Sequence, residues 1–281
     1  TLSRGTLSPV MRRNLMALLK TSDLSKSFGG LRAISNLNVE IESGSIHGLI
    51  GPNGSGKSTF FNLVTGVYHP DAGSQIIFDG HDTTKMASYE IANLGIARTF
   101  QLLRLFSEMT VLQNLMVGYH THVSYGFLRT LFNNSSVQKK DAETTDEMME
   151  LLEFIGLADF ARMPAGELSG GQRRLLALGR AMAMRPKLLM LDEPAAGLSP
   201  VNVDNLLTIV VALKERFGLT VLIVEHILKV VMETCDTVTV LDYGEKIGEG
   251  TPDEVKDDHA VIEAYLGQEM DDDEVRQVLH A

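Results

Sequence analysis

The chain has 281 residues, of which 44% are hydrophobic and 22% charged, as expected for one large globular domain or two modest ones. Its net charge of −11 argues against a sequence-independent nucleic-acid binder, because such proteins usually carry a basic balance. No apolar run approaches the roughly 20 residues of a membrane-spanning helix, and the start shows no secretory signal pattern. The single cysteine, Cys235, excludes an intramolecular disulfide and suits a reducing cytosol.

The first 20 residues are expected to form an appendage to the main fold. Leu15, Leu18 and Leu19 have helical spacing within Met11–Lys20, which predicts a helix that either lies on the surface or packs on a partner subunit. Strand patterns begin at Asp23. A half-buried strand, a short apolar strand, a helix and another strand are then predicted over Ala33–Ile41, Ile46–Ile50, Lys57–Thr65 and Ile76–Phe78.

The segment from Leu102 to Glu167 changes character, because the alternation of β-branched residues fades. Val111–Val117 and Ala142–Ile155 have the composition and period of helices, and the loop-like Tyr119–Lys140 lies between them. We therefore predict a helical insertion within a larger α/β domain.

Helices and apolar strands alternate after this insertion. Two helices are predicted over Gly170–Met184 and Val201–Phe217, and three strands over Lys187–Asp192, Thr220–Glu225 and Thr237–Leu241. Such alternation predicts a mostly parallel sheet covered by helices on both faces. Residues 251–281 are expected to form a C-terminal helix and a tail that includes the acidic run Glu269–Glu274.

The most specific motif is the glycine-rich run Gly51-Pro52-Asn53-Gly54-Ser55-Gly56-Lys57-Ser58, which lies between a predicted strand and a predicted helix. Glycines in such a loop let the backbone approach phosphates, and the following helix begins with free N–H groups. Lys57 would place a positive charge on the β- and γ-phosphates, Ser58 would offer a hydroxyl to Mg²⁺ and Thr59 would bind a more distal phosphate. The predicted phosphate-binding residues are Asn53, Gly54, Ser55, Gly56, Lys57, Ser58 and Thr59.

The apolar run Leu188–Leu191 ends in two carboxylates, Asp192 and Glu193. Open α/β sheets bind ligands at the carboxyl ends of their strands, so both side chains are expected beside the phosphate loop. Asp192 is predicted to hold Mg²⁺ through water, and Glu193 to polarise the attacking water as a general base.

A second anion site is predicted at Leu168-Ser169-Gly170-Gly171-Gln172. Ser169 has the position of a helix N-cap, and Gly170 and Gly171 would leave the first amides of the helix accessible. Two anion sites serve one triphosphate only if they close on it from opposite sides. The predicted ligands of this second site are Ser169, Gly170, Gly171 and Gln172.

Together with Gln101 and His226, these motifs resemble the nucleotide-binding subunit of an ATP-binding cassette (ABC) transporter over about residues 21–250. The resemblance implies ATP and Mg²⁺ as cofactors, and a P-loop core with a mostly parallel sheet, an antiparallel β subdomain and an inserted helical subdomain. The core would comprise residues 21–101 and 168–250, and the helical subdomain residues 102–167. Two subunits would pack head to tail, so that the 168–172 motif of one closes on the γ-phosphate held by the other.

The resemblance also assigns roles to three residues outside the main motifs. Gln101 would contact Mg²⁺ and the attacking water and report to the membrane subunits, and His226 would bind the γ-phosphate and position that water. Phe28 lies where the family places an aromatic ring on adenine, although a core phenylalanine at a strand end is the alternative. Many members carry an aspartate four residues after the Glu-Pro pair, whereas Leu198-Ser199 occupies that stretch here.

Two passages, Gly95–Gln101 with Leu105–Val111 and Leu191–Leu198, are similar to the ATP-binding subunits of branched-chain and hydrophobic amino-acid importers. This similarity implies a second ATP-binding subunit, identical or related, together with permease subunits and, indirectly, a periplasmic or extracellular solute-binding protein. The chain would lie on the cytoplasmic face of the membrane. The alternatives are a cassette for urea or lipopolysaccharide, and a soluble ATPase that acts on nucleic acid or ribosomes. Several of the apolar side chains over Leu102–Met109 are expected to be exposed, where they would accept a short helix of the permease.

Overall fold

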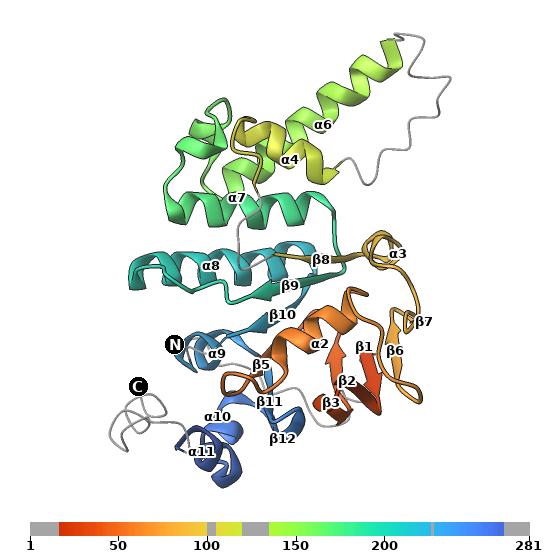
Figure 1. Cartoon of the computed structure of the whole chain (residues 1–281). Helices are drawn as coiled ribbons and strands as arrows, with labels where there is room; N and C mark the ends of the chain where they lie inside the picture. The colour runs from red at the N-terminus through yellow and green to blue at the C-terminus, as the bar shows by residue number, and fades with distance from the viewer. Residues whose placement is uncertain (1–16, 100–104, 120–134, 226–227, 267–281) are drawn as a thin grey trace.

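The computed structural model describes residues 17–99, 105–119, 135–225 and 228–266. Its strands form one six-stranded, one four-stranded and one two-stranded sheet, with a group of helices at one end (Figure 1). The predicted α/β class, with a mostly parallel core sheet, an antiparallel β part and a helical insertion, is confirmed. None of the described helices combines the length and the apolar character that a membrane span requires.

The six-stranded sheet forms the centre of the fold. In sheet order its strands are β12 (Glu245–Gly250), β11 (Thr237–Asp242), β5 (Ile46–Ile50), β10 (Thr220–Val224), β9 (Leu188–Asp192) and β8 (Ile96–Arg98). All neighbours pair in parallel except β11 and β12. Every residue of β5 and β10 is buried, as the continuous apolar runs predict for parallel strands covered on both faces.

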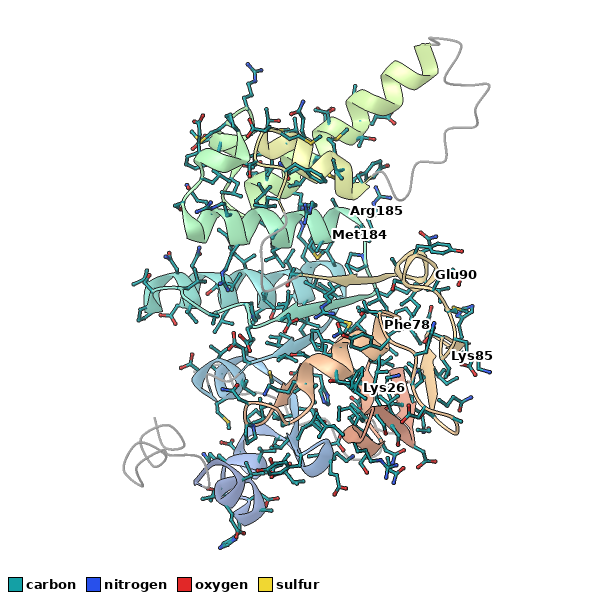
Figure 2. The ribbon with its side chains drawn as sticks, viewed as in Figure 1. Lys26, Phe78, Lys85, Glu90, Met184 and Arg185 are labelled. Carbon is teal, nitrogen blue, oxygen red and sulfur yellow. The ribbon has the colours of Figure 1, made fainter. Side chains whose placement is uncertain are left out.

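The two faces of this sheet bury alternate residues of each strand. On one face, Leu189 and Leu191 of β9 pack in a cluster with α7 (Gly170–Ala183) and α8 (Pro200–Phe217). On the other face, Leu188 and Met190 pack in a cluster with α2 (Lys57–Val64) and the antiparallel strands, where Phe78 is fully buried (Figure 2). This period of two fixes the register of the strands, because a shift by one residue would exchange the faces.

The start of the described chain differs from the predicted helical appendage. Residues 17–20 belong to β1 (Ala17–Ser22), which pairs with β4 (Glu40–Glu42) and β6 (Gln75–Phe78) in the four-stranded sheet. Leu19 is fully buried there. Pairing on both edges and burial of Leu19 outweigh the local helical spacing, so the helix prediction is wrong for residues 17–20, and residues 1–16 lie outside the description.

The single strand predicted over Ala33–Ile41 is divided between two sheets. β3 (Leu31–Leu37) pairs with β2 (Leu24–Phe28), whereas β4 pairs with β1. Asn36 has a positive φ of 45°, and the connection is held by the hydroxyl of Thr21, which accepts from the Val39 amide at 3.0 Å. The alternation of apolar residues continues from β3 into β4. The sequence pattern therefore does not show that the chain passes from one sheet to another between these strands.

The helical insertion packs α4 (Val111–Tyr119) and α6 (Ser135–Phe154) on α7 around a separate apolar cluster. The remaining elements connect or flank the core. They are β7 (His81–Asp82), α3 (Ser88–Leu94), α9 (Leu228–Thr234), α10 (Pro252–Lys256), α11 (His259–Leu266) and the short 3-10 helices η2 (Ala158–Phe160) and η3 (Ala165–Glu167). Short elements such as α3 and β8 were not predicted, because they lack a clear period of their own.

The central strand β5 contains a buried histidine that gives a test of this packing. His47 forms a 2.9 Å hydrogen bond with the hydroxyl of Thr239, and burial, followed by the charge of Lys246, lowers its pKa to about 4. The unfolded chain takes up a proton near the ordinary pKa, whereas the folded chain does so only near pH 4. The stabilisation that comes from keeping His47 neutral is therefore fully present above pH 6.5 and is lost as the pH falls from there toward 4.

We expect wild type to lose about 2 kcal/mol of unfolding free energy through His47 between pH 7 and pH 5. His47→Gln removes the titrating group, so its stability should fall by correspondingly less over the same interval. Urea unfolding of both proteins at the two pH values measures the difference. Parallel losses in wild type and variant would contradict this account.

Candidate nucleotide-binding site

The glycine-rich loop runs from the end of β5 to the start of α2. Three of its residues have positive φ, namely Gly51 at 150°, Gly54 at 83° and Gly56 at 105°. A Cβ on Gly51 would lie 2.0 Å from the Leu241 carbonyl, and one on Gly56 would lie 2.7 Å from the Ala33 carbonyl. Because backbone atoms cannot move aside cheaply, the loop requires glycine at both positions.

Lys57 places its ammonium group inside this loop. Its Nζ donates to the carbonyl of Gly51 at 2.6 Å and to that of Pro52 at 2.8 Å. Burial lowers the pKa of Lys57, and the charges of Glu193 and Asp192 act in the opposite direction. The cation of the loop therefore lies within electrostatic reach of both predicted carboxylates.

The loop also presents amides that suit an anion. Within the described part of the chain, the N–H groups of Gly54, Gly56 and Ser58 have no acceptor, and Gly54 and Ser58 are exposed. Asn53 is exposed, Ser55 is buried and Thr59 is half-buried. Free N–H donors at a helix N-terminus beside a lysine have the donor set that binds phosphate, so these residues fit a nucleotide.

Asp192, at the end of β9, is paired with an arginine that the sequence did not single out. Arg98 of β8 donates to its Oδ2 at 2.6 Å, and both side chains are only 11% exposed. Arg98 also donates to Asn62 at 2.7 Å and lies over the ring of Phe61. One carboxylate oxygen thus serves the ion pair, and Oδ1, which forms no such bond with the part of the chain that the structure describes, fits the oxygen ligand that Mg²⁺ prefers.

Glu193 follows in a left-handed conformation, with a φ of 46°. Its amide donates to the Val224 carbonyl at 2.9 Å, which fixes its backbone beyond the end of the strand. A second carboxylate lies nearby, because fully buried Glu225 accepts from the Ala195 amide at 2.7 Å. No role was predicted for Glu225 from the sequence. The only feature that could have indicated one is its position as an acidic residue at the end of an apolar strand.

The second predicted anion site begins α7. Ser169 is the N-cap, and its hydroxyl accepts from the Gln172 amide at 3.3 Å while the Gln172 side chain accepts from the Ser169 amide at 2.9 Å. Gly170 is exposed, and a Cβ there would meet nothing within 4 Å. The predicted cap therefore exists, and the first turn of α7 is open for close approach.

The structure separates this helix start from the phosphate loop. Figure 1 shows β9, β10 and α8 between α7 and α2. Phe28, at the end of β2, is 42% exposed and contacts the ring of Tyr68 edge-on at 5.2 Å, so the alternative of a core phenylalanine is wrong. Gln101 and His226 lie outside the described residues.

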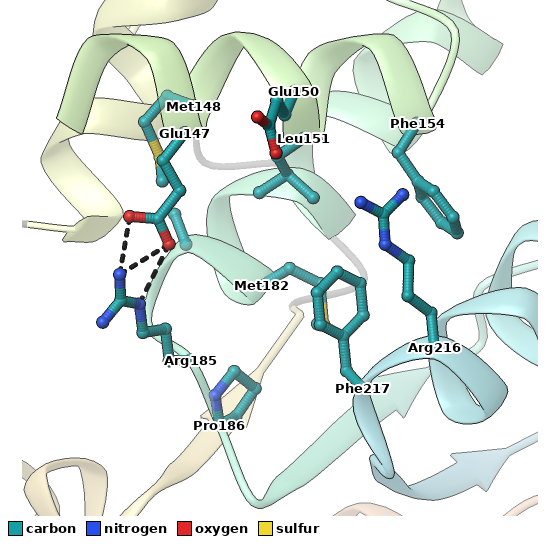
Figure 3. A pocket seen from close by; sticks show the side chains of 11 residues that line it. Glu147, Met148, Glu150, Leu151, Phe154, Met182, Arg185, Pro186, Arg216 and Phe217 are labelled. Carbon is teal, nitrogen blue, oxygen red and sulfur yellow. Dashed lines mark hydrogen bonds and ion pairs between the residues drawn. The ribbon is translucent and has the colours of Figure 1, made fainter. Parts of the chain in front are cut away.

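A cavity of about 380 Å³ lies elsewhere, between α6, α7 and the end of α8 (Figure 3). Its wall includes Met148, Met182 and Phe217, together with the ion pair of Glu147 and Arg185. None of the predicted nucleotide ligands lines it. The phosphate loop is an open surface of amides, so an enclosed cavity is not needed to mark it.

Comparisons with known proteins agree with this geometry. The model of the ABC transporter family matches residues 34–196, more than half of the chain, and a model described as a branched-chain amino acid ATP-binding cassette transporter matches residues 245–271. The chain is 41% identical to the high-affinity branched-chain amino acid transport ATP-binding protein BraF of Pseudomonas aeruginosa over 251 residues. It is 39% identical to the corresponding protein LivG of Escherichia coli over 251 residues. Each alignment covers 89% of this chain and 98% of the relative.

Solved structures show the same fold. The ADP conformation of an ATP-binding cassette from an ABC transporter matches with a TM-score of 0.78 and 36% identity. A nucleotide-free cassette matches with a TM-score of 0.77 and 35% identity. Each match covers 90% of this chain and all of the solved one.

The ion pair of Arg98 and Asp192 predicts that removal of the arginine lowers the stability of the folded chain. Arg98→Met should lower the free energy of unfolding by about 3 kcal/mol, because it leaves a buried carboxylate without its cation. Lys187→Met is the control. It breaks an ion pair with Asp79 in which the side chains are 55% and 40% exposed, and such pairs contribute less than about 1 kcal/mol. Urea unfolding at neutral pH measures both, and equal losses would contradict the assignment.

Proposed function

We propose that this chain, which belongs to the ABC transporter family of ATP-binding subunits, hydrolyses Mg²⁺-ATP to power the import of branched-chain amino acids. The observation that carries the catalytic part is that Lys57 lies inside a loop of free amides, within electrostatic reach of Asp192 and Glu193. The transported solute is inferred from the relatives, whose names specify branched-chain amino acid transport. The match at residues 245–271 supports the same solute class.

Different residues of the loop bind different parts of the Mg²⁺-triphosphate complex. The amides of Gly54, Gly56 and Ser58 and the ammonium of Lys57 bind phosphate oxygens, and Asn53, Ser55 and Thr59 complete the loop. The Ser58 hydroxyl and, through water, Asp192 would hold Mg²⁺, which would supply positive charge against the phosphate oxygens. Glu193 accepts the proton of the attacking water as the water oxygen bonds to the γ-phosphorus, while the bond from the γ-phosphorus to the β,γ-bridging oxygen breaks and ADP leaves. Phe28 offers an exposed ring for stacking on adenine.

A second ATP-binding chain, identical or related, completes each site. The first turn of α7, with Ser169, Gly170, Gly171 and Gln172, is separated from its own phosphate loop by strands and a helix. It therefore serves the γ-phosphate held by the partner chain, where its N-terminal amides favour negative charge. Gln101 and His226 are assigned to Mg²⁺ and water and to the γ-phosphate, on the basis of the sequence motifs alone.

The permease is the partner whose conformation changes when the ATP-binding subunits bind and hydrolyse ATP. Phe106 and Met109 are 47% and 38% exposed beside α4, as predicted for apolar residues of the 102–109 segment, although 102–104 lie outside the description. They form the docking patch for a short permease helix at the cytoplasmic face of the membrane, and the solute-binding protein acts only through the permease. The relatives favour branched-chain amino acids over urea or lipopolysaccharide, and the charge of −11 disfavours a nucleic-acid partner.

Glu193→Gln tests the proposed general base. The amide keeps the size of the side chain but cannot accept the proton, so turnover should fall by at least about 100-fold while ATP binding is retained. The variant should also accumulate as an ATP-bound dimer. Glu215→Gln, on the exposed side of α8, is the matched control and should retain wild-type turnover. Steady-state hydrolysis, equilibrium nucleotide binding and gel filtration with ATP give the three measurements, and wild-type turnover in Glu193→Gln would remove it as the base.

Phe106→Ser tests the docking patch. Loss of the exposed ring should reduce co-purification with the permease subunits by about tenfold, because interface aromatic residues commonly contribute 1–2 kcal/mol or more. Phe217→Ser, which removes a ring of similar exposure at the end of α8, should leave co-purification unchanged. Quantitative pull-down from detergent-solubilised membranes measures both. Equal recovery of the permease by the two variants would place the docking surface elsewhere.

A further inference from the structure

One side chain joins the start of α7 to the segment that carries Glu193. Nη1 of Arg174 donates to the Glu193 carbonyl at 3.0 Å and also to the Pro194 carbonyl, and Nη2 donates to the Ala196 carbonyl. A guanidinium group is a planar fork of five donors, which suits it to hold several acceptors in fixed positions. Arg174 therefore binds three carbonyls within the four residues that begin at Glu193.

The same segment is held on its other side by the sheet. The Glu193 amide donates to the Val224 carbonyl at 2.9 Å, and the Ala195 amide donates to Glu225 at 2.7 Å. Glu193 also has a positive φ, a conformation that a non-glycine residue keeps only while its surroundings hold it. The direction of the Glu193 side chain thus depends on contacts from the sheet and from α7 together.

The end of α7 that holds this segment is the end assigned to the partner's nucleotide. Arg174 lies five residues after the N-cap Ser169, about 7 Å along a continuous helix. Arg174, Ser169 and Gln172 line one cavity of about 260 Å³, which Asn202 of α8 also lines. A displacement of the first turn of α7 consequently reaches the guanidinium without an intervening hinge.

We propose that Arg174 is a positioning residue that couples the two ATP sites of the dimer. The inference rests on the proposed function, in which α7 of one chain binds the nucleotide of its partner while Glu193 acts on the nucleotide of its own chain. Closure of α7 on the partner's nucleotide fixes Arg174, and Arg174 fixes the backbone of Glu193. Occupancy of one site thereby sets the general base of the other, by a contact outside the atypical Leu198-Ser199 stretch.

Arg174→Met in the full-length chain tests the coupling, with Arg173→Met as the matched control. Arg173 is the preceding residue of α7 and is exposed, and its side chain forms no hydrogen bond or ion pair with the described residues. Hydrolysis is measured against Mg²⁺-ATP concentration to give kcat, KM and the Hill coefficient. For Arg174→Met we expect kcat to fall about tenfold or more, KM to stay within about threefold and the Hill coefficient to fall to about 1. Arg173→Met should match wild type in all three values.

The outcomes separate coupling from local support. A lower kcat with the wild-type Hill coefficient would show that Arg174 supports only its own site, and wild-type values throughout would show no role, so either result overturns the proposal. If Arg174→Met does not fold, Arg174→Lys replaces it, since lysine keeps the charge but not the fork, and the same fall in the Hill coefficient is expected. If wild type itself has a Hill coefficient of 1 and Glu193→Gln forms no ATP-dependent dimer, the two-chain function fails, and the coupling fails with it.

Discussion

The site depends first on the order of parallel strands in the central sheet. β10 lies between β5 and β9, and Val224 pairs with both Leu49 and Asp192. Strands in a sheet are about 4.8 Å apart, so the end of β5 and the end of β9 lie about 10 Å from each other. That spacing brings a loop that begins at Gly51 within electrostatic reach of two carboxylates that follow it by about 140 residues. The burial of alternate side chains on opposite faces keeps the strands in this register.

The phosphate loop also depends on segments outside the sheet. The Gly244 amide donates to the Ser55 carbonyl at 3.0 Å, and the Ser35 amide donates to the Gly244 carbonyl at 2.8 Å. These bonds join the loop, the turn after β11 and β3 of the antiparallel part. The close approach of Gly51 to Leu241 and of Gly56 to Ala33 is therefore a packing requirement as well as a conformational one. The same contacts hold β3, and with it its antiparallel partner β2, beside the loop.

Local patterns were sufficient where one segment determines its own structure. The sequence predicted the apolar runs of β5, β9 and β10, the N-cap at Ser169 and the glycine loop. Each of these features depends on the burial or the backbone conformation of a few adjacent residues. Pairing between segments that lie far apart in the sequence could not be predicted from such local patterns. Residues 17–20 read as helix because their strand partners lie elsewhere in the chain, and Arg98 gave no sign of pairing with Asp192, which is 94 residues away.

The carboxylates at the strand ends are surrounded by cations from three different segments. Arg98 comes from β8, Arg174 from α7 and Lys57 from the first turn of α2. Burial lowers the pKa of Arg174, and the charges of Glu225 and Glu193 act in the opposite direction, so these two carboxylates favour the charged form of Arg174. The three cations come from elements that lie far apart in the sequence, since β8, α7 and α2 begin at Ile96, Gly170 and Lys57. These side chains therefore join three elements of the fold, β8, α7 and α2, around the ends of β9 and β10.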